Sequence, residues 1–254
     1  MEQKSNKTIV LEFYKHIIGE CDISLVDSYV HDQYIQHNPT VKDGKSGLSE
    51  MITYLKQIPK PAEQKSPIVR IIEDGDFVAA HLDLVFMGKR MAVMDLFRLE
   101  DGKLVEHWDA IQGYPEQVSG EFSMTGGAAA VKGIALTDKN KSLVKRFLQE
   151  VIDNQGKEVH SDYLNPDYVE HNPEIIKTAR RLDNYLADSS NRSRIKIHRI
   201  IGEGNFVLFQ SEGTKNGRQF VFYDMLSIED NQIVEHWSVE QEIPDSLAHT
   251  NGMI

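Results

Sequence analysis

The chain has 254 residues, with 28 Lys or Arg against 39 Asp or Glu, and this net charge of −11 argues against binding nucleic-acid phosphates as the main activity. Its single cysteine, Cys21, excludes an internal disulfide, and no apolar run reaches the roughly 20 residues of a membrane-spanning helix. Because the first residues lack the apolar segment of a signal peptide, we expect a cytoplasmic protein that binds neither nucleic acid nor membrane.

Hydrophobic residues at helical spacing predict that the chain opens with an amphipathic helix over residues 7–18. Two shorter helices are expected around residues 25–29 and 49–57, on either side of His37-Asn38-Pro39. A residue before proline is biased away from helical geometry, so this HNP segment is predicted to be a turn or a loop.

After Pro67 the pattern changes to strands rich in Val, Ile and Phe. Turn-forming pairs interrupt these strands at residues 74–75, 88–89 and 101–102, and Asp-Gly between apolar strands is a strong hairpin signal. Helices followed by such strands predict an α+β domain, with the helices packed on one face of a curved antiparallel sheet.

The same series of motifs occurs twice along the chain. The sequence YIQHNP at residues 34–39 returns as YVEHNP at 168–173, and EHW at 106–108 returns at 235–237. So long a period indicates a duplicated domain, because solenoid repeats have only about 20–50 residues. Small residues without hydrophobic periodicity separate the copies and predict a linker. The predicted boundaries are 1–117 for the first domain, 118–136 for the linker and 137–254 for the second domain.

The hairpin turns also predict which residues share a face of the first sheet. With two-residue loops at 88–89 and 101–102, Leu96 pairs with both His81 and His107, and Met94 pairs with both Asp83 and Asp109. This register depends on strands without bulges. It places His81, Asp83, Met94, Leu96, His107 and Asp109 on one face, and Asp95, Phe97 and Trp108 on the other. Asp95 returns as Asp224 in the second copy, which favours a structural hydrogen bond for this pair.

The HNP segment after two helices, followed by strands that end in EHWDAIQ at 106–112, resembles the SnoaL-like polyketide cyclase family of the nuclear-transport-factor-2-like superfamily. The last residues, 251–254, are also similar to a tail common in these proteins. The resemblance covers both halves and implies two tandem cone-shaped α+β domains. Since domains of this superfamily commonly pair through their sheets, it further implies an internal pseudo-dimer and leaves a homo-oligomer open.

For the reaction, the resemblance implies cofactor-independent carbon-acid chemistry on a small carbonyl compound, such as an aldol cyclisation or an isomerisation. An aspartate of the late strand is the general base in the family's cyclases, and Asp109 matches that position. Ser238 stands there in the second half and cannot act as a base near neutral pH, so the resemblance implies an inactive second domain.

Removing a proton next to a carbonyl group needs a base close to it and a donor that stabilises the enolate. On the predicted face Asp109 is the catalytic base, and His81 and His107 are the catalytic donors. The remaining candidates, for contacts with the substrate, are His37, Asn38, Asp83, Met94, Leu96 and Gln112.

Two other functions stay open at this point. One is a non-catalytic protein that binds a small molecule in the same cavities, and the other is a hydrolase in which a second acid, such as Asp83, helps Asp109 activate water. The sequence has no zinc motif, no phosphate-binding loop and no dinucleotide fingerprint, so we expect neither a metal nor a cofactor.

Overall fold

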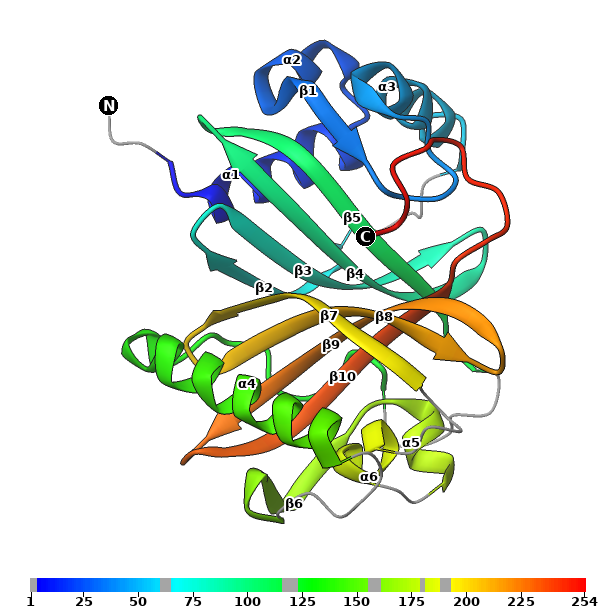
Figure 1. Cartoon of the computed structure of the whole chain (residues 1–254). Coiled ribbons are helices and arrows are strands. Elements are labelled where there is room, and N and C mark those ends of the chain that lie inside the picture. The colour runs from blue at the N-terminus through cyan, green and yellow to red at the C-terminus, as the bar shows by residue number, and fades with distance from the viewer. Residues whose placement is uncertain (1–3, 60–64, 116–122, 155–160, 179–180, 188–192) are drawn as a thin grey trace. The chain divides into compact units, whose positions relative to one another are not determined.

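The computed structural model describes residues 4–59, 65–115, 123–154, 161–178, 181–187 and 193–254 (Figure 1). The start of the predicted linker, residues 118–122, lies outside these ranges. The chain divides into two compact units, one of Met1–Ala80, Asp95–Asp109 and Pro244–Ile254, and one of His81–Met94 and Ala110–Ile243. Within the described ranges, no helix has both the length and the apolar character needed to cross a membrane.

The first half begins with helices and continues into a five-stranded sheet. Ser5 caps the first helix, since its hydroxyl accepts a hydrogen bond from the backbone N–H of Thr8. The helical elements are α1 (Asn6–Phe13), η1 (Tyr14–Gly19), η2 (Ile23–Leu25), α2 (Val26–Tyr29) and α3 (Gly44–Leu55). The strands are β1 (Val30–Gln36), β2 (Ile68–Asp74), β3 (Phe77–Phe86), β4 (Lys89–Glu100) and β5 (Lys103–Gly113), in the order β1-β5-β4-β3-β2.

The second half repeats this organisation. Its helical elements are η3 (Ile134–Leu136), α4 (Thr137–Asn154), η4 (Ser161–Tyr163), α5 (Pro173–Thr178) and α6 (Leu182–Ala187). Its strands are β6 (Leu164–Glu170), β7 (Ser193–Glu203), β8 (Phe206–Lys215), β9 (Arg218–Glu229) and β10 (Gln232–Glu242), in the order β6-β10-β9-β8-β7.

The predicted α+β class and the tandem organisation are therefore confirmed. The structure adds one feature to each predicted antiparallel sheet, because the strand before the HNP segment pairs in parallel with the last strand. Gln36 at the end of β1 lies opposite His107 of β5, and Glu170 at the end of β6 lies opposite His236 of β10. This pairing brings each HNP segment beside its own EHW motif.

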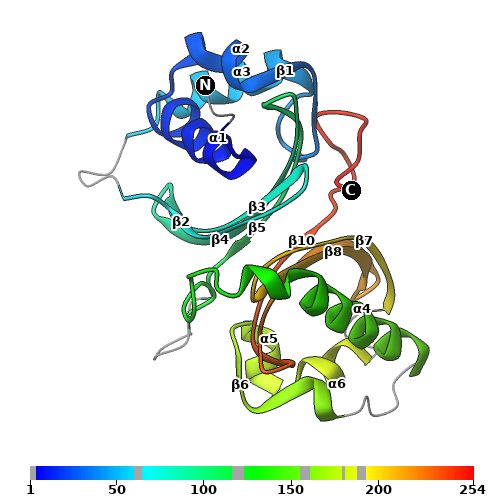
Figure 2. The same cartoon turned by 90° about the vertical axis from the view of Figure 1, so that its left-hand side faces the viewer.

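Each half has its own hydrophobic core between helices and sheet. In the first, Val10 and Phe13 of α1 and Ile17 of η1 pack with Phe97 and Leu99 of β4. In the second, buried residues of α4 pack with residues of β8, β9 and β10. Figure 2 shows each sheet curving around the opening helix of its half, α1 or α4. The helix-covered face of each sheet is therefore concave.

Candidate functional site

Three ionisable side chains of the first sheet gather on its helix-covered face. Asp95 comes from β4, and His107 and Asp109 come from β5. Each offers an oxygen or nitrogen atom, and these atoms all lie within 4.8 Å of one another. Asp95 and Asp109 are buried, with 7% and 5% of their surface exposed. Charged groups in such surroundings must be paired or must change their protonation.

The hydrogen bonds around His107 require a proton on each ring nitrogen. Nε2 lies 3.2 Å from a carboxylate oxygen of Asp95, and Nδ1 lies 3.1 Å from Oε1 of Gln36. Oε1 also accepts the backbone N–H groups of His37 and Asn38, each at 2.9 Å, which identifies it as the carbonyl oxygen. Both partners of the ring are thus acceptors, and His107 is an imidazolium cation. Burial lowers the pKa of His107, but the hydrogen bond and charge of Asp95 outweigh burial and raise it overall.

Both carboxylate oxygens of Asp95 accept hydrogen bonds. One of its oxygens accepts from His107, and the other accepts from the hydroxyl of Tyr14 in η1. Burial, followed by the charge of Asp95, raises the pKa of Tyr14 well above its usual value, so this hydroxyl keeps its proton. Asp95 therefore acts as the counter-ion of His107, consistent with the structural hydrogen bond that the sequence favoured.

Only one of the two carboxylate oxygens of Asp109 accepts a hydrogen bond from a described residue. Its Oδ2 accepts from the side-chain N–H of Asn38 at 2.6 Å, whereas its Oδ1 is buried and has no hydrogen-bond partner among the described residues. Burial raises the pKa of Asp109 from 3.8 to about 6, and the charge of Asp95 adds to this effect, while the charge of His107 and the hydrogen bond from Asn38 oppose it. The carboxylate thus combines a free oxygen with a proton affinity suited to near-neutral pH.

The HNP segment orients the amide of Asn38 toward Asp109. The Oδ1 atom of Asn38 accepts the backbone N–H of Thr40 at 2.9 Å and its hydroxyl at 2.7 Å, so the amide nitrogen must face the other way. The ring of His37 stacks on Trp108 at 4.9 Å, and its Nε2 donates to Glu106 at 3.0 Å. The HNP segment is therefore both the predicted turn and part of the surroundings of Asp109.

The C-terminal segment Pro244–Ile254 belongs to the same compact unit and holds the HNP segment in place. The carbonyl of Gly252 accepts Nδ1–H of His37 at 2.9 Å. Nε2 of His249 donates to the carbonyl of Asn38 at 2.9 Å, and the backbone N–H of Ala248 donates to the carbonyl of Pro39 at 2.9 Å. These contacts join residues more than 200 positions apart, and no local pattern in the sequence predicts them.

The predicted register of the first sheet is wrong in two places. The first is the turn between β3 and β4, which is formed by Met87 and Gly88 and not by residues 88–89, so that His81 lies opposite Met94 and not Leu96. This error leaves each side chain of β3 and β4 on its predicted face, because the pairing moves by an even number of residues. Met87 and Gly88 both have positive φ, 49° and 79°, as a tight two-residue hairpin loop requires. Methionine rarely adopts this conformation, which is why the sequence did not reveal the turn.

The second error is a change of register by one residue along the last strand, and it alone changes which side chains share a face. In the second sheet, where the same motif recurs, the pairing shifts between Ile233 and Glu235, so that Ser238 lies opposite Asp224. In the first sheet, His107 bonds to Asp95 and stacks on Phe97 at 4.6 Å, so these side chains share a face. A bulge inserts one residue into one strand and turns every later side chain to the other face.

The structure consequently brings Asp109, His107 and Asn38 together and adds Tyr14, Gln36 and Asp95, which were not predicted as site residues. His37 instead contacts Glu106 and Trp108, which strand alternation places on the opposite face of β5 from His107 and Asp109. The structure does not bring the other candidates to the helix-covered face. His81 and Asp83 follow Val78, a core residue of the helix-covered face, by three and five positions along β3, which places both on the opposite face. Strand alternation places Met94 and Leu96 of β4 and Gln112 of β5 there as well. Asp83 instead pairs with Arg90 and accepts the hydroxyl of Thr125 at 2.6 Å.

The second sheet carries a related cluster without the aspartate. His236 is fully buried between Glu170 at 2.8 Å and Asp224 at 3.1 Å. Burial lowers the pKa of His236, but these two carboxylates outweigh it and raise the pKa to about 9. The side-chain N–H of Asn172 donates to the hydroxyl of Ser238 at 2.5 Å, as Asn38 does to Asp109.

The ligand atoms of Asp95, His107 and Asp109 are close enough together to surround a cation. A histidine that binds a metal must be neutral, because the metal takes the lone pair of a ring nitrogen. His107 has both nitrogens occupied by hydrogen bonds to acceptors. The protonated form described above therefore has no ring lone pair to offer a metal.

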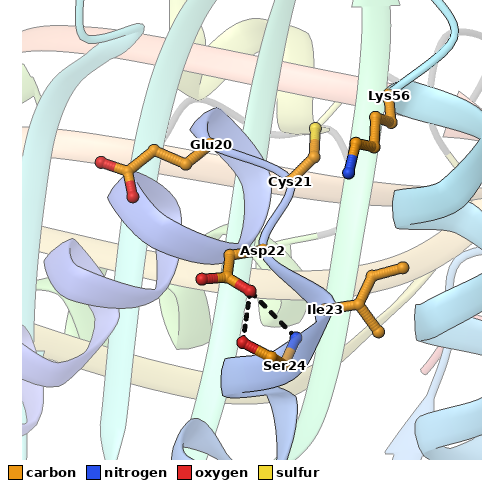
Figure 3. Close-up of a pocket in the computed structure, with 6 residues that line it drawn as sticks. All are labelled: Glu20, Cys21, Asp22, Ile23, Ser24 and Lys56. Atoms are coloured by element: carbon orange, nitrogen blue, oxygen red, sulfur yellow. Dashed lines mark hydrogen bonds between the residues drawn. The ribbon is translucent and has the colours of Figure 1, made fainter.

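A separate surface pocket of about 410 Å³ lies at the end of the opening helix, lined by Glu20, Cys21, Asp22, Ile23, Ser24 and Lys56 (Figure 3). The Asp22 carboxylate accepts both the backbone N–H and the hydroxyl of Ser24, at 3.0 and 2.6 Å. The pocket shares no lining residue with the cluster around Asp109. We assign it no role.

Comparison with known families gives a match to the SnoaL-like domain over residues 10–107 and again over 144–236. No curated protein matches the chain with significance.

Solved structures similar to the chain include TsrD from Streptomyces laurentii, with 21% identity over 44% of this chain and 92% of TsrD and a TM-score of 0.36. A SnoaL-like polyketide cyclase from Agrobacterium tumefaciens has 17% identity over 43% of this chain and 93% of its own, with a TM-score of 0.35. A steroid delta-isomerase from Pseudomonas aeruginosa has 15% identity over 47% of this chain and 88% of its own, with a TM-score of 0.34.

Proposed function

The chain belongs to the family of SnoaL-like domains, and from this membership and the surroundings of Asp109 we propose that its first domain catalyses cofactor-independent carbon-acid chemistry on a small carbonyl compound, with Asp109 as the general base. The observation that carries this proposal is the free Oδ1 of Asp109, buried and without a described hydrogen-bond partner. A carboxylate in this state binds a proton more readily than one in water.

The reaction balances with the residues at hand. Oδ1 of Asp109 takes a proton from the carbon next to a carbonyl group, and the electron pair of that C–H bond forms an enolate. In an aldol cyclisation, the enolate carbon attacks a second carbonyl of the same molecule, and the new alkoxide takes the proton back from Asp109. In an isomerisation, the proton returns to a different carbon. Atoms and electrons balance in both reactions, and neither needs an oxidant or a reductant.

The neighbours of Asp109 support this role. His107 and Asp95 form an ion pair with no net charge, so Asp95 adds less to the electrostatic cost of ionising Asp109 than an unpaired carboxylate would. Asn38 holds Oδ2 and leaves Oδ1 for the substrate. A hydrolase is less well supported, because both oxygens of Asp95, the nearest second acid, already accept hydrogen bonds.

We propose that the second domain lacks this activity, since a serine hydroxyl near neutral pH is not a base. Its cluster pairs His236 with two carboxylates that both accept hydrogen bonds from the ring. Internal pairing of the two domains, binding of a small-molecule ligand without catalysis and a cytoplasmic location stay predictions.

Proton–deuterium exchange tests the proposal directly. The α-proton of β-keto esters, beginning with ethyl 2-methylacetoacetate and extending to bulkier and cyclic members, is followed by NMR in D2O. We expect wild-type protein to accelerate exchange over buffer, and Asp109→Asn to lower the rate constant by about 10²–10⁴-fold. Ser238→Asn, at the equivalent position of the second domain, is the matched control and should keep wild-type rates. Equal exchange by wild type and Asp109→Asn, or none above buffer with any ester, would overturn the proposal in favour of binding.

A further inference from the structure

The two halves differ in one hydrogen bond of a buried tyrosine, and this difference concerns the proton that the proposed reaction needs. Tyr34 and Tyr168 are equivalent residues of β1 and β6. Each lies two positions before a side chain that bonds to the central histidine, Gln36 in the first half and Glu170 in the second. The two tyrosines therefore have the same place in the fold and chemically different partners.

In the second half, the hydroxyl proton of the tyrosine is donated in a hydrogen bond within the protein. The hydroxyl of Tyr168 donates to Oε2 of Glu170, because a carboxylate can only accept. The other oxygen of Glu170 accepts from His236 at 2.8 Å and from the backbone N–H of Asn172 at 2.7 Å.

In the first half, the direction of this hydrogen bond is reversed. Three donors fix Oε1 of Gln36, namely the backbone N–H groups of His37 and Asn38 and the ring of His107. Nε2 of Gln36 must therefore point to Tyr34, and it donates to the hydroxyl oxygen at 3.0 Å. Among the described residues, the Tyr34 hydroxyl has no other hydrogen-bond partner. Its proton is left without an acceptor, although only 3% of the residue is exposed.

Tyr34 is also placed to act together with Asp109. Gln36 lies opposite His107 in the parallel pair of β1 and β5, and alternate residues of each strand share a face, so Tyr34, Gln36, His107 and Asp109 all face the helices. Burial raises the pKa of Tyr34 well above its usual value, and after burial the charge of Asp109 is the largest cause. The Tyr34 hydroxyl therefore stays protonated.

We propose that the Tyr34 hydroxyl is the catalytic donor to the enolate oxygen, and that Gln36 is the positioning residue that leaves the Tyr34 proton free for it. This inference rests on the proposed function of Asp109. As Asp109 removes the α-proton, negative charge forms on the carbonyl oxygen, and the Tyr34 O–H donates a hydrogen bond to it without being transferred. The two N–H groups of His107 are held by Gln36 and Asp95 and cannot take this role. This assigns the donor that the sequence analysis expected of His81 and His107 to a different residue.

The test compares Tyr34→Phe with Tyr168→Phe, which removes the same hydroxyl from the second half. Exchange of ethyl 2-methylacetoacetate and the other β-keto esters is measured at increasing ester concentration. We expect Tyr34→Phe to lower kcat by about 10²–10³-fold and leave KM nearly unchanged, because an oxyanion donor acts mainly in the transition state. Tyr168→Phe should keep wild-type kinetics. If Tyr34→Phe exchanges as fast as wild type while Asp109→Asn does not, this inference fails and the proposed function stands. If wild type exchanges none of the esters, both fail.

A second variant tests the role of the Tyr34 proton while keeping the tyrosine side chain in place. Gln36→Glu keeps Tyr34 and the size of residue 36, and it recreates the partner that Tyr168 has in the second half. The new carboxylate should capture the Tyr34 proton and lower kcat as far as Tyr34→Phe does. Titration with 4-nitrophenolate, an oxyanion whose absorbance changes on binding, gives a second measure. Weaker phenolate binding by both variants, with thermal unfolding like that of wild type, supports the inference, and wild-type kcat or phenolate affinity in Gln36→Glu overturns it.

Discussion

The buried state of Asp109 predicts that the residue destabilises the protein as the pH rises. Its pKa is raised from 3.8 to about 6 on folding, so the unfolded chain loses this proton first as the pH increases. The contribution of Asp109 to stability is therefore most favourable below about pH 4, falls between about pH 4 and 6, and stays at the lower value above the folded pKa. At about 1.36 kcal/mol per pKa unit, the full loss is about 3 kcal/mol.

Asp109→Asn removes the titrating group and keeps a side chain of nearly the same size. We expect the free energy of unfolding of this variant, relative to wild type, to increase by about 3 kcal/mol between about pH 4 and pH 8. The chain has two tryptophans, so both proteins should also carry Trp237→Phe, which leaves Trp108 of β5 to report on the first sheet. Urea unfolding followed by the fluorescence of Trp108 then gives the difference at each pH.

Ser238→Asn is the control for this experiment, because it changes the equivalent position of the second sheet without removing an ionisable group. It should show no such change with pH. If the difference in free energy of unfolding between Asp109→Asn and wild type is the same at every pH, burial does not raise the pKa of Asp109. The physical basis for its role as a base is then lost.

Two further predictions concern the residues that hold the site. Asn38→Ala removes a hydrogen bond that lowers the pKa of Asp109, so the pH at which exchange reaches half of its maximum should rise, and an unchanged or lower midpoint would contradict the assigned contact. Deleting residues 248–254 removes the hydrogen bonds of the C-terminal segment to the HNP segment, and a resulting displacement of Asn38 should lower the exchange kcat by up to about 100-fold. Fluorescence of Trp108, in a chain that also carries Trp237→Phe, would verify that the first sheet stays folded, and full activity of the shortened chain would show that the segment does not position Asn38.

The sequence by itself determined the organisation of the protein. A repeat of 134 or 129 residues revealed the duplicated domain, and helical spacing followed by turn-separated strands predicted the α+β class. These features depend on local patterns or on a comparison of the chain with itself. The exchange of Asp109 for Ser238 between the copies was visible for the same reason.

Only the tertiary structure decided which side chains meet Asp109. Successive residues of a strand point to opposite faces, so a register shift of one residue between β4 and β5 moved Asp95 onto the face of Asp109 and left His81 on the other. Tyr14, Gln36 and the C-terminal segment reach the site from distant parts of the chain. The direction of the hydrogen bond at Tyr34 depends on all three donors to Gln36 being in place at once. Spacing along the sequence does not contain that information, because contacts between strands and segments far apart in the chain create it.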